Sequence, residues 1–180
     1  MTIAGTASPV TVRPATPADL PALGRLGALM VRVHHDFDAQ RFISPTPGTE
    51  QGYGRFLISQ LEEADRFVLA AEGAPGVVGY AYAGIEGPDW MALRGPAGAL
   101  YDVVVDPAHR HRGIGRMLLD ATLAELRARG AERVVLSTAE GNTAAQRLFA
   151  AAGFRRTMIE MTRELGPAGG GAEPDAAQAP

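Results

Sequence analysis

Glycines and arginines gather between residues 106 and 116, the part of this sequence best equipped for chemistry. The first turn of a helix carries unpaired N–H groups and a partial positive charge, so it can bind an anion. Glycine lets the backbone approach a phosphate closely, and arginine adds positive charge. The glycines are Gly113 and Gly115, and the arginines are Arg110, Arg112 and Arg116. The segment therefore predicts a phosphate site, with an ordinary strand-to-helix turn and solvated arginines as the alternative.

Two common phosphate motifs do not match this loop. A dinucleotide fingerprint needs a third glycine after Gly115, and the required position does not hold one. A nucleoside triphosphate loop needs a Gly-Lys-Ser or Gly-Lys-Thr sequence, and this chain contains no lysine. The phosphate must therefore belong to another kind of ligand.

The elements that must position this loop alternate along the chain. A Thr-Pro-Ala-Asp sequence at residues 16–19 is typical of a helix start, and leucines then recur at helical spacing. We expect strands at 10–14, 66–72, 77–85, 99–106 and 133–138, helices at 16–33, 49–63, 113–129 and 143–152, and an extended segment at 154–165. This order predicts a single α+β domain at residues 10–165, built around one sheet. The ends, 1–9 and 166–180, are small and polar and are predicted to be disordered tails.

Two motifs resemble those of the GNAT superfamily of N-acetyltransferases. The first is R-x-x-G-x-G at residues 110–115, preceded by Val-Asp-Pro. The second is Asn-Thr-Ala-Ala-Gln-Arg-Leu-Phe at residues 142–149, followed by Ala-Gly-Phe at 152–154. The resemblance implies a GNAT-like α+β fold, with a central mixed, mostly antiparallel sheet flanked by about four helices. It implies acetyl-CoA as cosubstrate and an amine as acceptor.

The same resemblance implies how this chain would hold the cofactor. The backbone of Val103, Val104 and Val105 would pair with the pantetheine arm like an added strand. Asn142 would lie near that arm and would also cap the helix that follows it. The residues expected to hold the pyrophosphate are Arg110, His111, Arg112, Gly113, Ile114, Gly115 and Arg116.

On the acceptor side, the resemblance implies a pocket built from the first two helices and from the loop before the central strand. Its candidate residues are His34, His35, Asp38 and Trp90. Carboxylates and imidazoles there would favour a cationic amine. A metal site fits poorly because no third ligand accompanies His34 and Asp38, and a solvated helix end remains the alternative. Trp90 either lines the acceptor pocket or fills the hydrophobic core beneath its loop.

The chemistry requires a base for the amine, a donor for the oxyanion and an acid for the thiolate. The backbone N–H of Val104 is the expected oxyanion donor, and Asp102 is one candidate base. In many GNAT relatives the acid is a tyrosine at the position held here by Phe149, which has no proton to donate. The candidates that remain are Tyr101, Ser137, Thr138 and water. Tyr101 is expected to share a strand face with Val103 and Val105.

Composition limits the other functions. A net charge of −3 gives no general attraction to nucleic acid or anionic membrane. The absence of cysteine excludes a thiolate metal site and a cysteine nucleophile. Without a recognisable signal peptide or membrane span, we expect a cytoplasmic protein. We therefore predict an acetyl-CoA-dependent N-acetyltransferase that uses direct attack in a ternary complex on a small-molecule or protein amine. The alternative is a CoA-binding module without catalysis, and a homodimer is compatible with either function.

Overall fold

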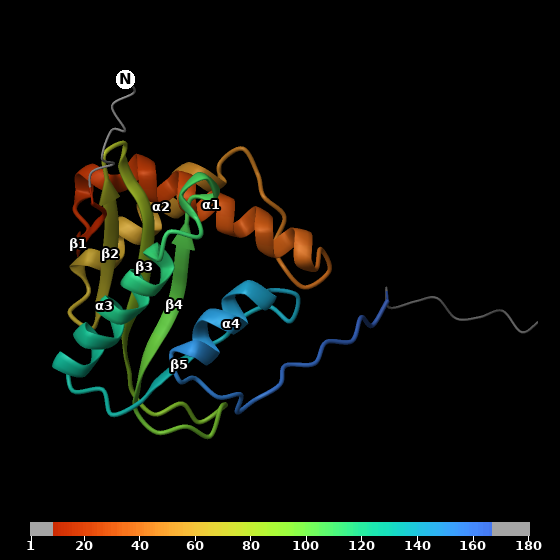
Figure 1. Ribbon diagram of the computed structural model, residues 1–180. Helices are drawn as coiled ribbons and strands as arrows, with labels where there is room; N and C mark the ends of the chain where they lie inside the picture. Colours follow the sequence, from red (N-terminus) through yellow and green to blue (C-terminus); the bar gives the residue numbers. More distant parts are fainter. Residues whose placement is uncertain (1–8, 167–180) are drawn as a thin grey trace, which may run out of the picture.

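The computed structural model describes residues 9–166, which form a five-stranded sheet with helices on both faces (Figure 1). The strands are β1 (Thr11–Pro14), β2 (Arg66–Gly73), β3 (Gly76–Glu86), β4 (Ala97–Val105) and β5 (Val134–Leu136). The helices are α1 (Leu20–Phe37), α2 (Thr49–Ser59), α3 (Ile114–Ala128) and α4 (Thr143–Ala151). The predicted tails lie almost entirely outside the described residues.

The strands lie side by side in chain order. The first four pair antiparallel, and β5 pairs parallel to β4 through three residue pairs. This confirms the predicted α+β class and the mixed, mostly antiparallel sheet. The expected extended segment at 154–165 forms no strand in the described part of the chain.

Each face of the sheet has its own apolar core. On one face, α3 packs against side chains such as Leu69, Val78 and Leu100. On the other face, α1 and α2 pack against a second set that includes Val68, Tyr80 and Val104. The sheet therefore separates two apolar cores. The face toward which a β4 side chain points decides whether it contacts α3 or the pair α1 and α2.

The close crossing of α1 and α2 sets the position of one aromatic residue. A Cβ added at Gly27 of α1 would overlap the ring of Tyr53 from α2. The absence of a side chain at Gly27 therefore lets Tyr53 lie between α1 and the sheet, where its hydroxyl reaches β4. Glycine is required here for space rather than for a special backbone angle.

A β-bulge in β4 changes the direction of its side chains. Tyr82 of β3 pairs with Asp102 and Ala83 pairs with Leu100, so Tyr101 is an extra residue without a partner of its own. A bulge of this kind turns two consecutive side chains to one face and reverses the alternation beyond it. Tyr101 and Asp102 accordingly both face α1 and α2.

Candidate active site

The predicted phosphate loop lies between β4 and α3, as the sequence indicated. Residues Pro107–His109 form a short 3-10 turn that Asp106 caps by accepting a hydrogen bond from the Ala108 N–H at 3.0 Å. His111 and Gly113 both adopt positive φ, 60° and 79°, which turns the chain sharply into α3. The first hydrogen bond of the helix runs from Met117 N to Gly113 O.

The backbone of this loop is arranged to bind an anion. Because Met117 makes the first helical bond, the N–H groups of Ile114, Gly115 and Arg116 precede it and lack helical acceptors. An added Cβ at Gly113 would meet nothing within 4 Å, so the space in front of this turn is open. The loop thus presents free donors to open space at the positive end of a 15-residue helix.

The loop arginines differ in what they do. Arg110 donates from Nε to the Val105 carbonyl at 3.2 Å. Arg116 donates to both carboxylate oxygens of Asp120 at 2.8 Å, one turn further along α3. Arg112 is exposed. These side chains surround the loop with positive charge, although Asp120 offsets that of Arg116.

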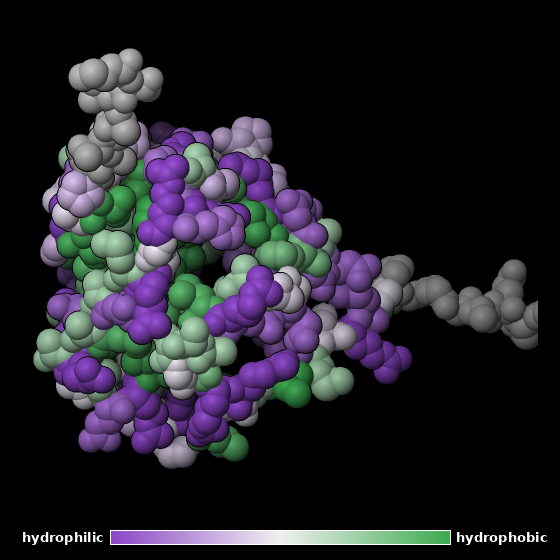
Figure 2. Space-filling view, in the orientation of Figure 1, coloured by the Kyte–Doolittle hydropathy of each residue, from purple (hydrophilic) through white to green (hydrophobic). Residues whose placement is uncertain are grey.

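Beyond Leu100, β4 has an open edge. The pairing with β5 ends at Leu100 and Leu136, so the two strands separate from that point. Figure 2 shows the surface hollowed between α3 and α4, on the face where this separation occurs. A free strand edge is a template for another extended chain, which is the arrangement expected for a pantetheine arm.

The ladder between β3 and β4 corrects one predicted role. Asp106 donates its N–H to Val78 of β3, and backbone groups alternate in direction along an antiparallel strand. The backbone N–H of Val104 therefore points toward Tyr80, its partner in β3, and is not free to bind an oxyanion. The backbone groups of Val103 and Val105 face the open edge instead. The N–H that faces the open edge is thus that of Val103 rather than that of the predicted donor Val104.

Tyr101 does not occupy the predicted face. The expectation that it shares a face with Val103 and Val105 is wrong, because the bulge turns it toward α1 and α2 while those valines face α3. Its hydroxyl donates to Glu86 at 2.7 Å and accepts from Arg66. Burial raises the pKa of Tyr101, and the bond to Glu86 raises it further. Its role as general acid stays a prediction.

Asp102 is the centre of a buried polar cluster. Only 7% of the residue is exposed, and one carboxylate oxygen accepts hydrogen bonds from Tyr53 at 2.7 Å and Tyr80 at 3.0 Å. Burial raises the pKa of Asp102, while the two hydroxyls and the nearby His34 lower it. The two phenols satisfy a carboxylate that would otherwise be costly to bury.

The remaining catalytic and cofactor candidates lie around α4 and β5. Asn142 caps α4 by accepting a hydrogen bond from the Ala145 N–H at 3.1 Å, which confirms its capping role. Phe149 is half-buried, and its ring meets that of Phe154 edge-on at 5.8 Å. Ser137 is exposed just after β5, and Thr138 is half-buried beside it. Their catalytic roles stay predictions.

The histidines of the acceptor prediction lie near the end of α1. His34 contacts the Met30 carbonyl through Nδ1 at 2.9 Å, and His35 contacts the Phe42 carbonyl at 3.2 Å. Asp38 uses its carboxylate to accept from the backbone N–H groups that follow it. Of these three side chains, His34 is the one that contributes to lowering the pKa of Asp102.

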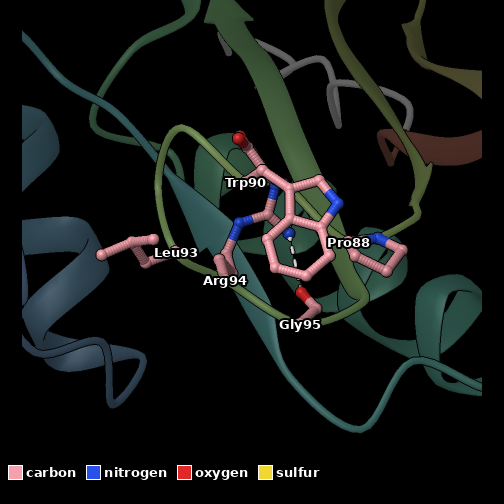
Figure 3. A pocket seen from close by; sticks show the side chains of 6 residues that line it. Pro88, Trp90, Leu93, Arg94 and Gly95 are labelled. Atoms are coloured by element: carbon pink, nitrogen blue, oxygen red, sulfur yellow. Dashed lines mark hydrogen bonds and ion pairs between the residues drawn. The ribbon is translucent and has the colours of Figure 1, made fainter.

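Trp90 belongs to a separate hollow. Its side chain is 84% exposed, so the suggestion that it plugs the core beneath its loop is wrong. It lines a hollow of about 270 Å³ formed wholly by the loop between β3 and β4. Figure 3 shows its indole beside Arg94, with Leu93 pointing away. The residues of α1 do not contribute to this hollow, so one pocket does not unite Trp90 with His34.

Two general properties complete the description of the site. No group of three or more metal-binding side chains occurs among residues 9–166. Within the same residues, no helix is long and apolar enough to cross a membrane.

An open strand edge that leads into an anion-binding helix start defines the class of acyltransferases that hold coenzyme A along a strand. The model of the acetyltransferase (GNAT) family matches residues 33–154. The chain therefore belongs to the GNAT acetyltransferase family.

Similarity to individual proteins is consistent with this membership. A mycothiol acetyltransferase from Thermobispora bispora is 43% identical over 95 residues, which are 51% of this chain and 30% of that protein. The chain thus spans about a third of the length of this curated relative. A variant of the BH1408 protein from Bacillus halodurans superposes with a TM-score of 0.72 at 21% identity, covering 86% of this chain and 99% of that one. The aminoglycoside N-acetyltransferase AAC(6')-Iy in complex with CoA gives 0.69 at 18% identity, covering 90% and 98%.

Several residues of the site were not predicted from the sequence. Tyr53, Tyr80, Glu86 and Arg66 come from three elements and meet only through the sheet and the helix crossing. One signal was present: polar-tipped aromatic residues lie in stretches that are otherwise apolar. A buried tyrosine hydroxyl needs a partner, which implies a buried polar cluster but does not identify its members.

Proposed function

We propose that this protein transfers the acetyl group of acetyl-CoA to an amine within a ternary complex. The observation that carries the proposal is the open edge of β4 leading directly into the free N–H groups at the start of α3. An acyl-CoA has an extended amide-containing arm and a pyrophosphate. The strand edge suits the arm and the helix start suits the pyrophosphate.

The proposed reaction uses groups on both sides of β4. The neutral amine attacks the thioester carbonyl, the C–S bond breaks, and the thiolate leaves while the amine loses a proton. The Val103 N–H would stabilise the oxyanion, because it faces the open edge. Asp102 remains the candidate base, and Tyr101, Ser137, Thr138 or water would protonate the thiolate, because Phe149 has no proton to donate.

We propose a small-molecule amine as the acceptor. Asp102 and Glu86 put carboxylates on the face of β4 opposite α3, and negative charge favours a cationic amine. The names of the relatives point the same way, since one is a mycothiol acetyltransferase and another an aminoglycoside N-acetyltransferase. A cytoplasmic location accompanies this proposal as a prediction.

Calorimetry and a thiol-release assay test the proposal together. Acetyl-CoA should bind and raise the melting temperature, since a ligand specific to the folded state stabilises it. Thiol release should then depend on an added amine, in a panel of aminoglycosides, amino sugars, amino acids and peptide N-termini. A protein that shows neither heat of binding nor a thermal shift with millimolar acetyl-CoA would contradict the proposal.

The second candidate function is a CoA-binding module without transfer activity. The phenylalanine at position 149 favours it, because the hydroxyl common at this place in the family is absent. This module would bind acetyl-CoA with the same affinity yet release no thiol with any amine of the panel. The two functions therefore differ only in the second measurement.

A further inference from the structure

Helix α1 passes over β4 and ends beside the loop that leads into α4. Near its start, Arg25 pairs with Asp106 just after β4, with Nη1 and Oδ2 2.6 Å apart. At its end, Phe37 lies against Gly141, where an added Cβ would come within 3.1 Å of the Phe37 ring. Figure 1 shows the helix extending past β4 toward this loop. The last turns of α1 therefore span the gap that opens where β4 and β5 separate, on the face opposite α3.

His34 lies in one of these last turns, and its ring is held by several contacts. The Nδ1 atom lies 2.9 Å from the Met30 carbonyl, one turn earlier in the helix. The rings of Phe37 and Phe42 meet the imidazole edge-on, with centroids 6.1 and 5.0 Å away. The residue is half-buried. These contacts fix the orientation of the imidazole before any substrate is bound.

The contact with Met30 determines which nitrogen of His34 can act as a base. A carbonyl oxygen only accepts hydrogen bonds, so the proton of the neutral ring must be on Nδ1. The free lone pair is then on Nε2. Among residues 9–166, no group hydrogen-bonds to Nε2, and the atom is not buried. His34 therefore offers an unoccupied proton acceptor on the part of α1 that spans the gap.

Asp102 is less accessible than His34. The residue is 7% exposed, and its Oδ2 atom accepts hydrogen bonds from both Tyr53 and Tyr80. An incoming amine therefore has little access to this carboxylate, although the charge of a buried carboxylate can still stabilise a nearby cation. The interaction exists in the structure, because His34 helps to lower the pKa of Asp102.

Other charged groups lie on the segments around this ring. Arg41 belongs to the connection between α1 and α2, and its guanidinium lies over the Phe42 ring at 5.1 Å. Asp38 follows α1 and accepts from backbone N–H groups. Glu140 precedes Gly141 in the loop after β5. The carboxylates of this region offset Arg41 and would stabilise a positive charge that forms on the imidazole during a reaction.

We propose that His34 is the general base of the transfer reaction, a role that rests on the proposed function and takes the place of Asp102 as proton acceptor. The lone pair of the amine forms a bond to the thioester carbonyl carbon, and the C–S bond then breaks. The amine nitrogen gives one proton to Nε2 of His34, and the departing thiolate takes one proton from the general acid. His34 afterwards releases its proton to water. Asp102 stays in its cluster and stabilises the imidazolium by its charge.

The pH dependence of thiol release tests this role. His34→Asn keeps a donor for the Met30 carbonyl and lacks Nε2. We expect turnover to fall about 100-fold or more, because general base catalysis contributes about 10²–10⁴-fold, while the Kd of acetyl-CoA measured by calorimetry is unchanged. The wild-type turnover should decrease at acid pH as the base becomes protonated, and the variant should lack this decrease.

His35→Asn is the matched control. The Nδ1 atom of His35 contacts a carbonyl in the same way, that of Phe42 at 3.2 Å. Whatever this variant does to the KM of the amine, it should keep the acid decrease in turnover. The assignment would be overturned by a His34→Asn variant with wild-type turnover and pH profile, or by a His35→Asn variant that loses the acid decrease as fully.

Chemical rescue distinguishes a base from a packing residue. In His34→Ala, imidazole added to the solution should restore turnover about tenfold or more, whereas it should not accelerate the wild type. A folded His34→Ala variant, identified by its unchanged thermal shift with acetyl-CoA, that shows no recovery would overturn the proposal.

The tautomer of His34 provides a test that does not depend on turnover. Heteronuclear NMR of the histidine side chains, assigned with His34→Asn, should show the proton of the neutral ring on Nδ1. A proton on Nε2 would overturn the proposal. Thiol release by the wild type is measured first. If it is absent with every amine of the panel, the proposed function fails, whereas an active wild type with an equally active His34→Asn variant refutes the role of His34 alone.

Discussion

Gly113→Glu should weaken cofactor binding by about 100-fold or more and leave the fold in place. Gly113 caps α3 with φ of 79°, and an added Cβ there meets nothing within 4 Å. The variant therefore costs backbone strain of about 1–2 kcal/mol but creates no clash. For a chain of this size, that loss corresponds to a fall in melting temperature of roughly 2–8 °C.

The effect on affinity should be much larger. A carboxylate about 4 Å from a phosphate repels it by about 4 kcal/mol at an effective dielectric constant of about 20. Solvent screening reduces this figure, and a residual of about 2.7 kcal/mol still weakens binding about 100-fold. The side chain also occupies the space through which the free N–H groups reach their ligand.

Gly130→Glu is the matched control. Gly130 lies at the other end of α3 with φ of 90°, and a Cβ there also meets nothing within 4 Å. Its strain is the same, and a carboxylate at a helix C-terminus is less favourable than one at the N-terminus. It should lose at least as much stability as Gly113→Glu and bind acetyl-CoA normally by calorimetry. If Gly113→Glu binds as tightly as the wild type, the phosphates bind elsewhere.

Three further predictions concern single side chains. Phe149→Tyr should hold or raise turnover by up to about 100-fold, because the half-buried ring can present a hydroxyl to the thiolate; a less stable variant with unchanged thiol release would contradict this. Tyr101→Phe removes the donor to one oxygen of Glu86, whose other oxygen keeps Arg94, and removes the acceptor of Arg66; it should cost about 1–3 kcal/mol in denaturant unfolding, with turnover reduced less than about tenfold, and a normally stable variant with a far larger loss would identify Tyr101 as the acid. The hydrogen bond from Arg13 lowers the pKa of Asp19 to about 2. Because the folded-state pKa lies below the ordinary value, this stabilisation is present above about pH 4 and is lost as the pH falls toward 2. It should amount to about 1–2 kcal/mol after solvent screening, and Asp19→Asn should remove that pH dependence from the unfolding free energy.

The cofactor side could be predicted from the sequence because its signals are local. The glycines, the arginines and the helix start after Asp106 are consecutive, and the anion-binding property of a helix N-terminus depends on the first turn alone. The cap at Asn142 is local in the same way. Amphipathic spacing likewise fixed most of the helices, and α1 merely continues one turn beyond the predicted end at residue 33.

The acceptor side depends on contacts between distant residues. A strict period of two along β4 put Tyr101 on one face with Val103 and Val105. The bulge at Tyr101 reverses that alternation, and a bulge is defined by the register with β3 rather than by the sequence of β4.

The meeting of Tyr53, Tyr80 and Asp102 is also a tertiary property, since 49 and 22 residues separate the two tyrosines from the aspartate. The sequence by itself therefore determined the loop between β4 and α3 and the family. The pairing register and the helix crossing decided which side chains meet on each face of the sheet, because a shift of one residue in a strand exchanges its two faces.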